Sequence, residues 1–375
     1  MIPDVAVIGA GSFGTWTAWH LRQAGLRVVL VDGYGAANSR ASSGGESRII
    51  RAGYGPREIY TRFSIRSLEM WRDLAARTDP TLFHPCGALW LAPQDDPFAL
   101  ETGQTLTRYG VRFDRLDTPA LEKRFPWFRP AAGTWAIFEP EAGALMARRA
   151  IQTLARDLDF ERRLVSWTAS AAVAEDGSAL RAGTYVFACG PWLGKVFPEI
   201  VGRRIQPSRQ EVFFFGTPPG WNYGPDRVPC WIDVASKFYG MGDLENRGFK
   251  VANDLHGPTV DPDTLERVAS DEGLRLARAY LSERIPSLAG APLVESRVCQ
   301  YENTANGDYL IDQHPDHRNV WIAGGGSGHG FKHGPAVGEY LAGRILGRTA
   351  EEVRFSLASK PEIEGFGPSS SFYRQ

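Results

Sequence analysis

A glycine-rich turn between two apolar runs near the N-terminus constrains the fold of this chain most strongly. The run Val5–Ile8 is typical of a buried strand, and it leads directly into Gly9-Ala-Gly-Ser-Phe-Gly14. An amphipathic stretch follows, and a second apolar run, Val28–Val31, ends at Asp32. A Gly-x-Gly-x-x-Gly motif marks a dinucleotide site when it stands in this strand, turn, helix and strand context. The sequence therefore predicts a βαβ unit that binds a dinucleotide.

Each glycine of this motif has a mechanical role in such a unit. Gly9 allows the tight turn, Gly11 lets a pyrophosphate approach the backbone, and Gly14 lets the helix pack closely on the strand. The N-terminus of the helix then offers N–H groups and a partial positive charge to the phosphates. Asp32 stands where an acid is expected to bind the ribose hydroxyls.

Length and composition limit the remaining possibilities. The chain has 375 residues, 43% of them apolar, so two domains are expected rather than one. A net charge of −1 gives no reason to expect nucleic acid or an anionic membrane as a partner. No apolar run reaches the ~18 residues needed to span a bilayer, and Met1 opens almost directly onto the first strand, so we expect neither a membrane segment nor a cleaved signal. The four cysteines lack metal-ligand spacing, which predicts no metal site and a reducing, cytoplasmic setting.

The rest of the pattern predicts a nucleotide-binding fold built from separated pieces, with β-rich insertions between them. Strands are expected at 86–92, 185–190, 211–215, 230–234, 237–239, 248–251 and 320–323. Helices are expected at 60–76, 145–158, 262–284 and about 335–346, and residues 99–128 as helix plus short connections. Asp261 before Pro262 is a reasonable cap and first-turn pair for the helix at 262–284.

A second glycine-rich turn favours a flavin over a nicotinamide cofactor. The apolar run at 320–323 leads into Gly324–Gly330, and a predicted helix follows. A nicotinamide enzyme would need only the first turn, whereas a second helix N-terminus can reach another part of the cofactor. Reduced flavin carries negative charge near its N1–C2 carbonyl, which a helix N-terminus or a cation stabilises. The alternative interpretation is a flexible loop.

Seven segments together resemble a known family. They are Gly9–Gly14, Ser47–Arg51 with Tyr54-Gly55, Ile137–Leu145, Ala188–Trp192, Cys299-Gln-Tyr301, Ile311–His317 and Ser327–Lys332. The chain is similar in these segments to the flavin-dependent amine oxidases typified by monomeric sarcosine oxidase, within the D-amino-acid-oxidase superfamily. The resemblance implies an α/β fold with a Rossmann-type, glutathione-reductase-like FAD-binding domain and a second α+β substrate domain on an antiparallel sheet. On this basis we assign residues 1–84, 140–208 and 292–375 to the FAD-binding domain, and residues 85–139 and 209–291 to the substrate domain.

The resemblance also implies an activity. Members of the family are monomers that oxidise secondary amines or N-substituted and cyclic amino acids. The C–H next to nitrogen donates a hydride to flavin N5, the imine is hydrolysed, and O2 is reduced to H2O2. A fructosyl amino acid oxidase and an FAD amino-acid dehydrogenase with a non-oxygen acceptor remain alternatives. A flavoprotein that binds tRNA or protein is a further one, against which the near-neutral charge argues.

Two residues carry the cofactor and oxygen chemistry that the resemblance implies. Cys299 matches the cysteine that forms a thioether to the flavin 8α-methyl group, and a thiolate is the competent nucleophile for such a bond. Lys250 matches the lysine that promotes the reaction with oxygen, since a fixed cation stabilises superoxide as it forms. The alternatives are a buried structural cysteine and an exposed strand lysine.

The substrate residues follow from the same resemblance. Arg51 and Lys332 match two cations that hold the substrate carboxylate, and a guanidinium presents a planar fork to such a group. Either could instead pair with an acid on the surface. Tyr239 and Tyr301 match aromatic residues that border the substrate cavity, although ordinary core packing is an alternative.

The chain departs from the sarcosine enzyme at two places. That enzyme has a histidine pair where this chain has Ser43-Gly44, and an active-site histidine where it has Asp254. We expect a roomier and more polar substrate site, with Asp254 among its catalytic residues. His329 is expected to order the second glycine turn. The residues expected to contact the cofactor are Gly9, Gly11, Ser12, Phe13, Gly14, Asp32, Ser47, Arg48, Leu164, Cys299, Gly328, Gly330, Phe331 and Lys332.

Overall fold

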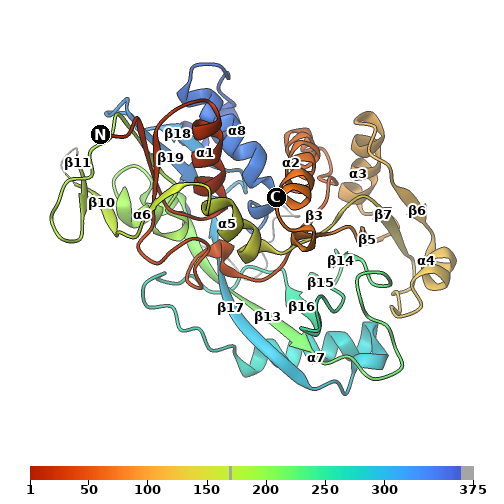
Figure 1. The fold of residues 1–375 in the computed structure, drawn as a ribbon. Coiled ribbons are helices and arrows are strands. Elements are labelled where there is room, and N and C mark those ends of the chain that lie inside the picture. Colours follow the sequence, from red (N-terminus) through yellow and green to blue (C-terminus); the bar gives the residue numbers. More distant parts are fainter. Residues whose placement is uncertain (169–170, 365–375) are drawn as a thin grey trace.

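Two large β-sheets organise the computed structural model, which describes residues 1–168 and 171–364 (Figure 1). The six-stranded sheet has the order β18-β19-β12-β1-β2-β9. Its strands are β1 (Val5–Ile8), β2 (Val28–Val31), β9 (Asp159–Glu161), β12 (Thr184–Phe187), β18 (Leu310–Gln313) and β19 (Val320–Gly324). All of its neighbouring pairs are parallel except β18 with β19. The predicted βαβ unit is therefore confirmed, and the second glycine turn follows β19 in the same sheet.

Two helices that follow these glycine turns pack against each other. Helix α1 (Ser12–Gln23) begins directly after Gly11, and α8 (Gly334–Ile345) follows the second turn. A Cβ atom on Gly338 would lie 2.6 Å from the backbone carbon of Trp16, so only glycine allows this approach. The two helices lie side by side beside the six-stranded sheet in Figure 1, which brings both turns to one edge of it.

The eight-stranded sheet has the order β17-β13-β16-β15-β14-β5-β7-β6. Its strands are β5 (Ala88–Pro93), β6 (Asp114–Leu116), β7 (Thr134–Glu139), β13 (Gln206–Phe215), β14 (Cys230–Asp233), β15 (Phe238–Met241), β16 (Phe249–Asn253) and β17 (Leu293–Asn303). Only the β14–β5 pair is parallel. The long strands β13 and β17 run side by side from beneath the six-stranded sheet into this one (Figure 1), so β17 can carry side chains to both.

Smaller elements complete the fold. A three-stranded sheet joins β3 (Arg48–Ile50), β8 (Gly143–Leu145) and β4 (Phe83–His84), and β10 (Val165–Thr168) pairs with β11 (Ala171–Ala174). The other helices are α2 (Glu58–Arg77), α3 (Pro97–Arg108), α4 (Thr118–Arg124), α5 (Ala147–Ala155), α6 (Leu193–Val196) and α7 (Asp271–Arg284). Separate apolar cores form around the six-stranded sheet and under the eight-stranded one.

The α/β fold class is confirmed, but two predicted segments were wrong. The helix expected at 262–284 begins only at Asp271. Ser270 caps it by accepting a hydrogen bond from the Gly273 N–H (3.0 Å), and the Ser270 hydroxyl donates to Glu211 on β13. Residues 99–128 hold two helices, α3 and α4, separated by strand β6. The division into two domains stays a prediction: β17 falls in the proposed FAD-binding segment yet pairs with β13, and residues 365–375 of that segment lie outside the described residues.

Candidate active site

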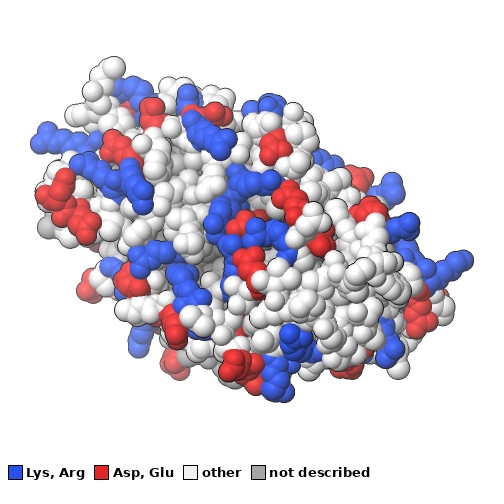
Figure 2. Space-filling view, turned by 60° about the horizontal axis from the view of Figure 1, so that its bottom comes forward, with Lys and Arg blue, Asp and Glu red and all other residues white. Residues whose placement is uncertain are grey.

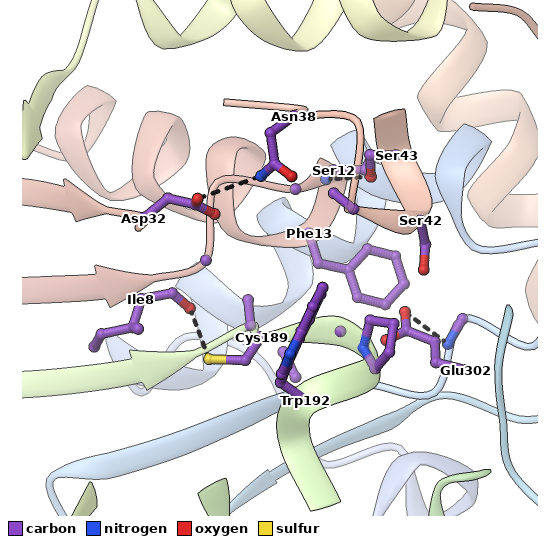
Figure 3. A pocket seen from close by; sticks show the side chains of 18 of the residues that line it. Ile8, Ser12, Phe13, Asp32, Asn38, Ser42, Ser43, Cys189, Trp192 and Glu302 are labelled. Atoms are coloured by element: carbon purple, nitrogen blue, oxygen red, sulfur yellow. Dashed lines mark hydrogen bonds between the residues drawn. The ribbon is translucent and has the colours of Figure 1, made fainter. Parts of the chain in front are cut away.

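The first glycine turn opens onto a cavity of about 300 Å³. Figure 3 shows Asp32, Ser12, Phe13 and Glu302 around it. The Ala10 N–H donates to Asp32 Oδ2 (2.9 Å), and the Tyr34 N–H donates to Asp32 Oδ1 (2.8 Å). Asp32 therefore fixes the turn as well as lining the cavity.

The glycines have the geometry that the motif predicted. Gly9 has a φ of +107°, and a Cβ atom there would lie 2.3 Å from the Ala188 carbonyl oxygen. A Cβ on Gly14 would lie 1.9 Å from the Gly9 carbonyl oxygen, so Gly14 serves helix–strand packing and lines neither described cavity. A Cβ on Gly11 would project toward the cavity, with Ser43 Oγ at 3.4 Å as its nearest neighbour.

These features fit a bound dinucleotide. The N-cap residue of α1, Gly11, makes no side-chain cap, and the Ser12 N–H donates to Ser43 Oγ (3.0 Å), so a phosphate would approach the helix through the other N–H groups of its first turn. The buried Ser42 Oγ, which belongs to a cavity-lining residue, has no hydrogen-bond partner within residues 1–168 and 171–364. A ligand that brings hydroxyl and phosphate groups would supply the missing partner.

Glu302 is a cavity residue that the sequence patterns did not identify. It lies one position after Tyr301 on β17, and its Oε1 accepts a hydrogen bond from the Gly326 N–H (3.3 Å). Its Oε2 atom is buried and finds no partner in the part of the chain that the structure describes. Burial raises the pKa of this carboxyl to about 7. The residue therefore presents a weakly acidic group to whatever occupies the cavity.

A second cavity, of about 380 Å³, adjoins the first. Its lining includes Arg51, Tyr239, Lys250, Asp254, Cys299 and Lys332. Four of the predicted site residues line both cavities, namely Arg48, Tyr301, Gly328 and Phe331. The structure thus brings together every predicted site residue except Gly14 and Ser47 around one continuous space.

Lys250 projects from β16 and is completely enclosed. Its ammonium group donates hydrogen bonds to the Ser47 carbonyl oxygen (2.9 Å) and the Ser47 hydroxyl (3.3 Å). Burial, with a smaller contribution from the nearby Arg48 charge, lowers the pKa of Lys250 to about 7. Ser47 lines neither cavity and instead holds Lys250 in place.

Arg51 and Lys332 are buried together. The Arg51 guanidinium lies 4.1 Å from the centre of the Trp90 ring and 4.4 Å from that of Tyr54. Lys332 donates to the Tyr54 hydroxyl (2.6 Å) and to the His329 carbonyl oxygen (3.0 Å). Burial and the Arg51 charge hold the pKa of Lys332 well below its usual range. The site therefore concentrates positive charge that an anionic ligand would balance.

Two supporting residues near these cations were also missed by the sequence patterns. The Glu139 carboxylate accepts hydrogen bonds from the Ala52 (2.7 Å) and Gly53 (3.0 Å) N–H groups, which fixes the backbone after Arg51. Tyr54 connects Lys332 to His329. The His329 ring bridges the Gly307 carbonyl oxygen and the Tyr309 hydroxyl, each at 3.0 Å, so it orders the second glycine turn.

Three polar side chains, Tyr239, Tyr301 and Asp254, line the same cavity as these cations. The hydroxyl groups of Tyr239 and Tyr301 lie 3.3 Å apart. Burial raises the pKa of Asp254 to about 7, although the charges of Arg51, Lys237 and Lys332 oppose that rise. The Asp254 Oδ2 atom accepts no hydrogen bond from any residue that the structure describes. It is therefore available to a ligand that carries a donor.

Cys299 lies on β17, in the wall of the second cavity. Its sulfur is 3.6 Å from a guanidinium nitrogen of Arg48 and 3.8 Å from the Ser42 carbonyl oxygen. The thiol is thus placed beside residues that line both cavities.

A dinucleotide cavity joined to a polar, cationic one is the arrangement of a flavin oxidoreductase. The family model for FAD dependent oxidoreductases matches residues 4–344, and the chain belongs to that family. It is 30% identical to a monomeric sarcosine oxidase of Bacillus sp. (strain B-0618), over 96% of this chain and 97% of the relative. It is 28% identical to an N-methyl-L-tryptophan oxidase of Salmonella heidelberg (strain SL476), over 92% and 95% of the two chains. The structure of NikD, an unusual amino acid oxidase essential for nikkomycin biosynthesis, superimposes with a TM-score of 0.79 at 21% identity, covering 97% of this chain and 99% of that one.

These comparisons confirm the resemblance and the requirement for FAD. The protein is an FAD-dependent oxidoreductase. Among residues 1–168 and 171–364, no helix has the length and apolar character to cross a bilayer, and no group of three or more side chains could hold a metal ion.

Proposed function

We propose that the protein is an oxidase of secondary amines, acting on N-substituted or cyclic amino acids with O2 as the acceptor. The observation that carries the proposal is the pair of buried cations, Arg51 and Lys332, in a cavity that shares a wall with the cofactor cavity. Relatives whose names specify sarcosine and N-methyl-L-tryptophan as substrates support it.

The two cations would orient the substrate through its carboxylate. The Arg51 guanidinium is fixed between two aromatic rings, and the Lys332 ammonium group is fixed by Tyr54. A carboxylate between them relieves their mutual repulsion and gains charge-assisted hydrogen bonds. Both groups are held before the substrate arrives, so little freedom is lost on binding.

Asp254 would accept the proton of the substrate ammonium group. Its pKa of about 7 suits a group that exchanges a proton near neutral pH, and Tyr239 and Tyr301 border the same space. The neutral amine then has the lone pair that drives hydride loss from the adjacent carbon. FAD, when bound, accepts that hydride, and water hydrolyses the imine.

Lys250 would stabilise the negative charge that develops as O2 is reduced to H2O2. A preorganised cation in a site without water is worth more than the same charge in solution. Ser47 holds it in place. Cys299 would anchor the flavin covalently through a thioether, aided by Arg48. We further propose that the protein acts as a monomer in the cytoplasm.

Anaerobic titration of the flavin absorbance tests the proposal. The protein is mixed without oxygen with sarcosine, pipecolate, proline, N-methyl amino acids and fructosyl-glycine. At least one secondary amine should bleach the flavin, while the matched primary amino acid glycine should do so far more slowly. If no amine in the panel bleached the flavin, the proposed function would be wrong.

Admission of air to the reduced protein then distinguishes an oxidase, which uses O2 as the acceptor, from a dehydrogenase, which does not. An oxidase forms one H2O2 for each flavin reduced, whereas a dehydrogenase stays bleached until a quinone is added. Fructosyl-glycine is the substrate of the second candidate, a fructosyl amino acid oxidase. Asp254 favours that candidate, because its buried Oδ2 atom, which accepts no hydrogen bond from the described residues, can bind sugar hydroxyl groups as readily as an amine.

A further inference from the structure

Two cysteines outside both cavities lie in direct contact. The sulfur atoms of Cys86 and Cys230 are 3.8 Å apart. Cys230 is the first residue of β14 and is completely buried, while Cys86 precedes β5 and is half-buried. The other two cysteines contact other groups: Cys189 contacts the Ile8 carbonyl oxygen, and Cys299 contacts Arg48 and Ser42.

The sheet register holds these two sulfurs together. Strands β5 and β14 are parallel neighbours, with Cys230 opposite Ala88. The Cys230 N–H also donates a hydrogen bond to the Gly87 carbonyl oxygen (3.1 Å). The backbone next to Cys86 is therefore fixed against Cys230, and the contact does not depend on a flexible loop. A disulfide has sulfurs about 2.05 Å apart, so the two sulfur atoms must move closer together before they bond.

We infer that Cys86 and Cys230 form a dithiol that hydrogen peroxide oxidises to a disulfide. Cys86 attacks peroxide as a thiolate, the O–O bond breaks, and Cys86 sulfenic acid and hydroxide form. The Cys230 sulfur then displaces hydroxide from the Cys86 sulfur as the S–S bond forms. The proton that Cys86 released on forming the thiolate and the Cys230 proton convert the two hydroxides to water. In total two thiols lose two electrons, and peroxide is reduced to two waters.

The environment assigns different roles to the two sulfurs. The hydrogen-bond contact with Cys230 lowers the pKa of the Cys86 thiol, and burial raises the pKa of Cys230. Cys86 is also the more exposed of the two. It is thus the sulfur that meets peroxide, and Cys230 is the one that resolves the sulfenic acid.

The pair lies next to the position at which we propose that peroxide is formed. Met241 on β15 pairs with Lys250 on β16, and it packs in one apolar cluster with Cys230. Cys230 and Lys250 also interact electrostatically. The source of peroxide in turnover rests on the proposed function, but the reactivity of the dithiol does not.

The test uses the complete, flavin-loaded protein, reduced and freed of reductant. Treatment with a slight excess of H2O2 should remove two hydrogens from the intact mass. Non-reducing peptide mapping should find the peptides of Cys86 and Cys230 linked, and dithiothreitol should reverse the change. The Cys86→Ser variant should not form the link, while the matched Cys189→Ser variant should form it as the wild type does.

Mapping of the wild type decides the matter even if a variant fails to fold. Cys86 and Cys230 recovered unlinked, as free thiols or as sulfinic acids, would overturn the inference, as would a link to another cysteine. A second arm supplies the amine that bleaches the flavin, in air, with and without catalase. A link formed with added peroxide but not in turnover would count against the proposed oxygen chemistry and leave the dithiol assignment standing.

Discussion

The ammonium group of Lys250 lies 2.9 Å from the carbonyl oxygen of Ser47 and donates a hydrogen bond to it. This contact ties the eight-stranded sheet to the segment that leads from the dinucleotide turn to Arg51. Lys250, which we propose acts in the oxygen chemistry, is therefore positioned by the same backbone segment that carries Arg51, which we propose binds the substrate carboxylate. The basic side chains that gather along the middle of one face in Figure 2 have acidic neighbours, whereas these two cations are buried.

Replacement of Lys250 by methionine should slow the reoxidation of reduced flavin by O2 about a hundredfold and leave flavin reduction nearly unchanged. Since the pKa of Lys250 is about 7, its charged fraction falls as the pH rises through 7. The wild-type reoxidation rate should therefore decline over that range. The Lys250→Arg variant should be less sensitive to pH, because its guanidinium stays charged. Stopped-flow measurements between pH 6 and 9 check this, and a pH-dependent Lys250→Met variant would contradict it.

Replacement of Arg51 by methionine should raise the KM for the amino acid substrate about 10- to 100-fold, because a hydrogen bond to a charged group contributes about 1.5–3 kcal/mol. Steady-state kinetics and anaerobic substrate titration measure the effect. Arg115→Met is the matched control, since Arg115 also stacks on a tryptophan, Trp135, but lies outside both cavities. An equal effect of the two substitutions would argue against a carboxylate site.

Asp254→Asn should change the pH dependence of stability. The folded protein holds the Asp254 proton up to about pH 7, whereas the unfolded chain releases it near the ordinary value of 3.8. The folded state thus binds more protons between these values, so the stability contributed by this group is full below pH 4 and lost as the pH rises to 7. Asparagine cannot titrate. The variant should therefore gain stability relative to the wild type over this range, by up to roughly 4 kcal/mol.

Thermal unfolding at several pH values measures that difference. The exposed Asp226 offers a control, because Asp226→Asn should run parallel to the wild type. A constant difference between the Asp254→Asn variant and the wild type would show that the buried carboxyl is ionised throughout.

The Cys299→Ser variant should release its flavin on acid precipitation, whereas the wild-type flavin should stay with the polypeptide. A thioether survives acid, and a serine hydroxyl cannot replace the thiolate nucleophile. Cys189→Ser is the control, because Cys189 lines the dinucleotide cavity without a matching role. Absorbance of the supernatant and intact mass give the answer, and free FAD from the wild type would exclude the covalent bond.

Glu302→Leu, made in the Cys299→Ser background so that binding is reversible, should weaken FAD affinity about tenfold, the cost of one lost hydrogen bond. Glu302→Gln should bind nearly as well as its parent, because an amide keeps both a donor and an acceptor. Quenching of flavin fluorescence during reconstitution reports the affinity. Equal affinities for the two variants would mean that Oε2 does not contact the cofactor.

Much of the fold follows from local patterns. The apolar runs that lead into the two glycine turns specify β1 and β19 without help from distant residues, and the turns themselves require glycine. The prediction of a helix at 262–284 was wrong because two possible N-caps, Asp261 and Ser270, lie within ten residues of each other. Ser270 prevails through its contact with Glu211 on β13, which is not apparent from the local sequence.

The polar interior of the site was harder to predict. Nothing in the local sequence distinguishes Glu302 from other strand residues. Its hydrogen-bond donor, the Gly326 N–H, lies 24 positions later in the chain. Tyr54 and Lys332 are separated by 278 positions. Contacts between residues so far apart leave no periodic signal, so only the resemblance to a family brought Lys332 into the site, and nothing pointed to Tyr54 as its partner.

The close packing of α1 against α8 has a consequence for how the protein matures. The first turn is complete within the opening residues of the chain, but the helix that packs on α1 does not begin until Gly334. A ribosome must therefore have released the chain to beyond Ile345 before the two turns can meet. Binding of the cofactor is consequently a late event in biosynthesis, and chains truncated before α8 should not bind FAD.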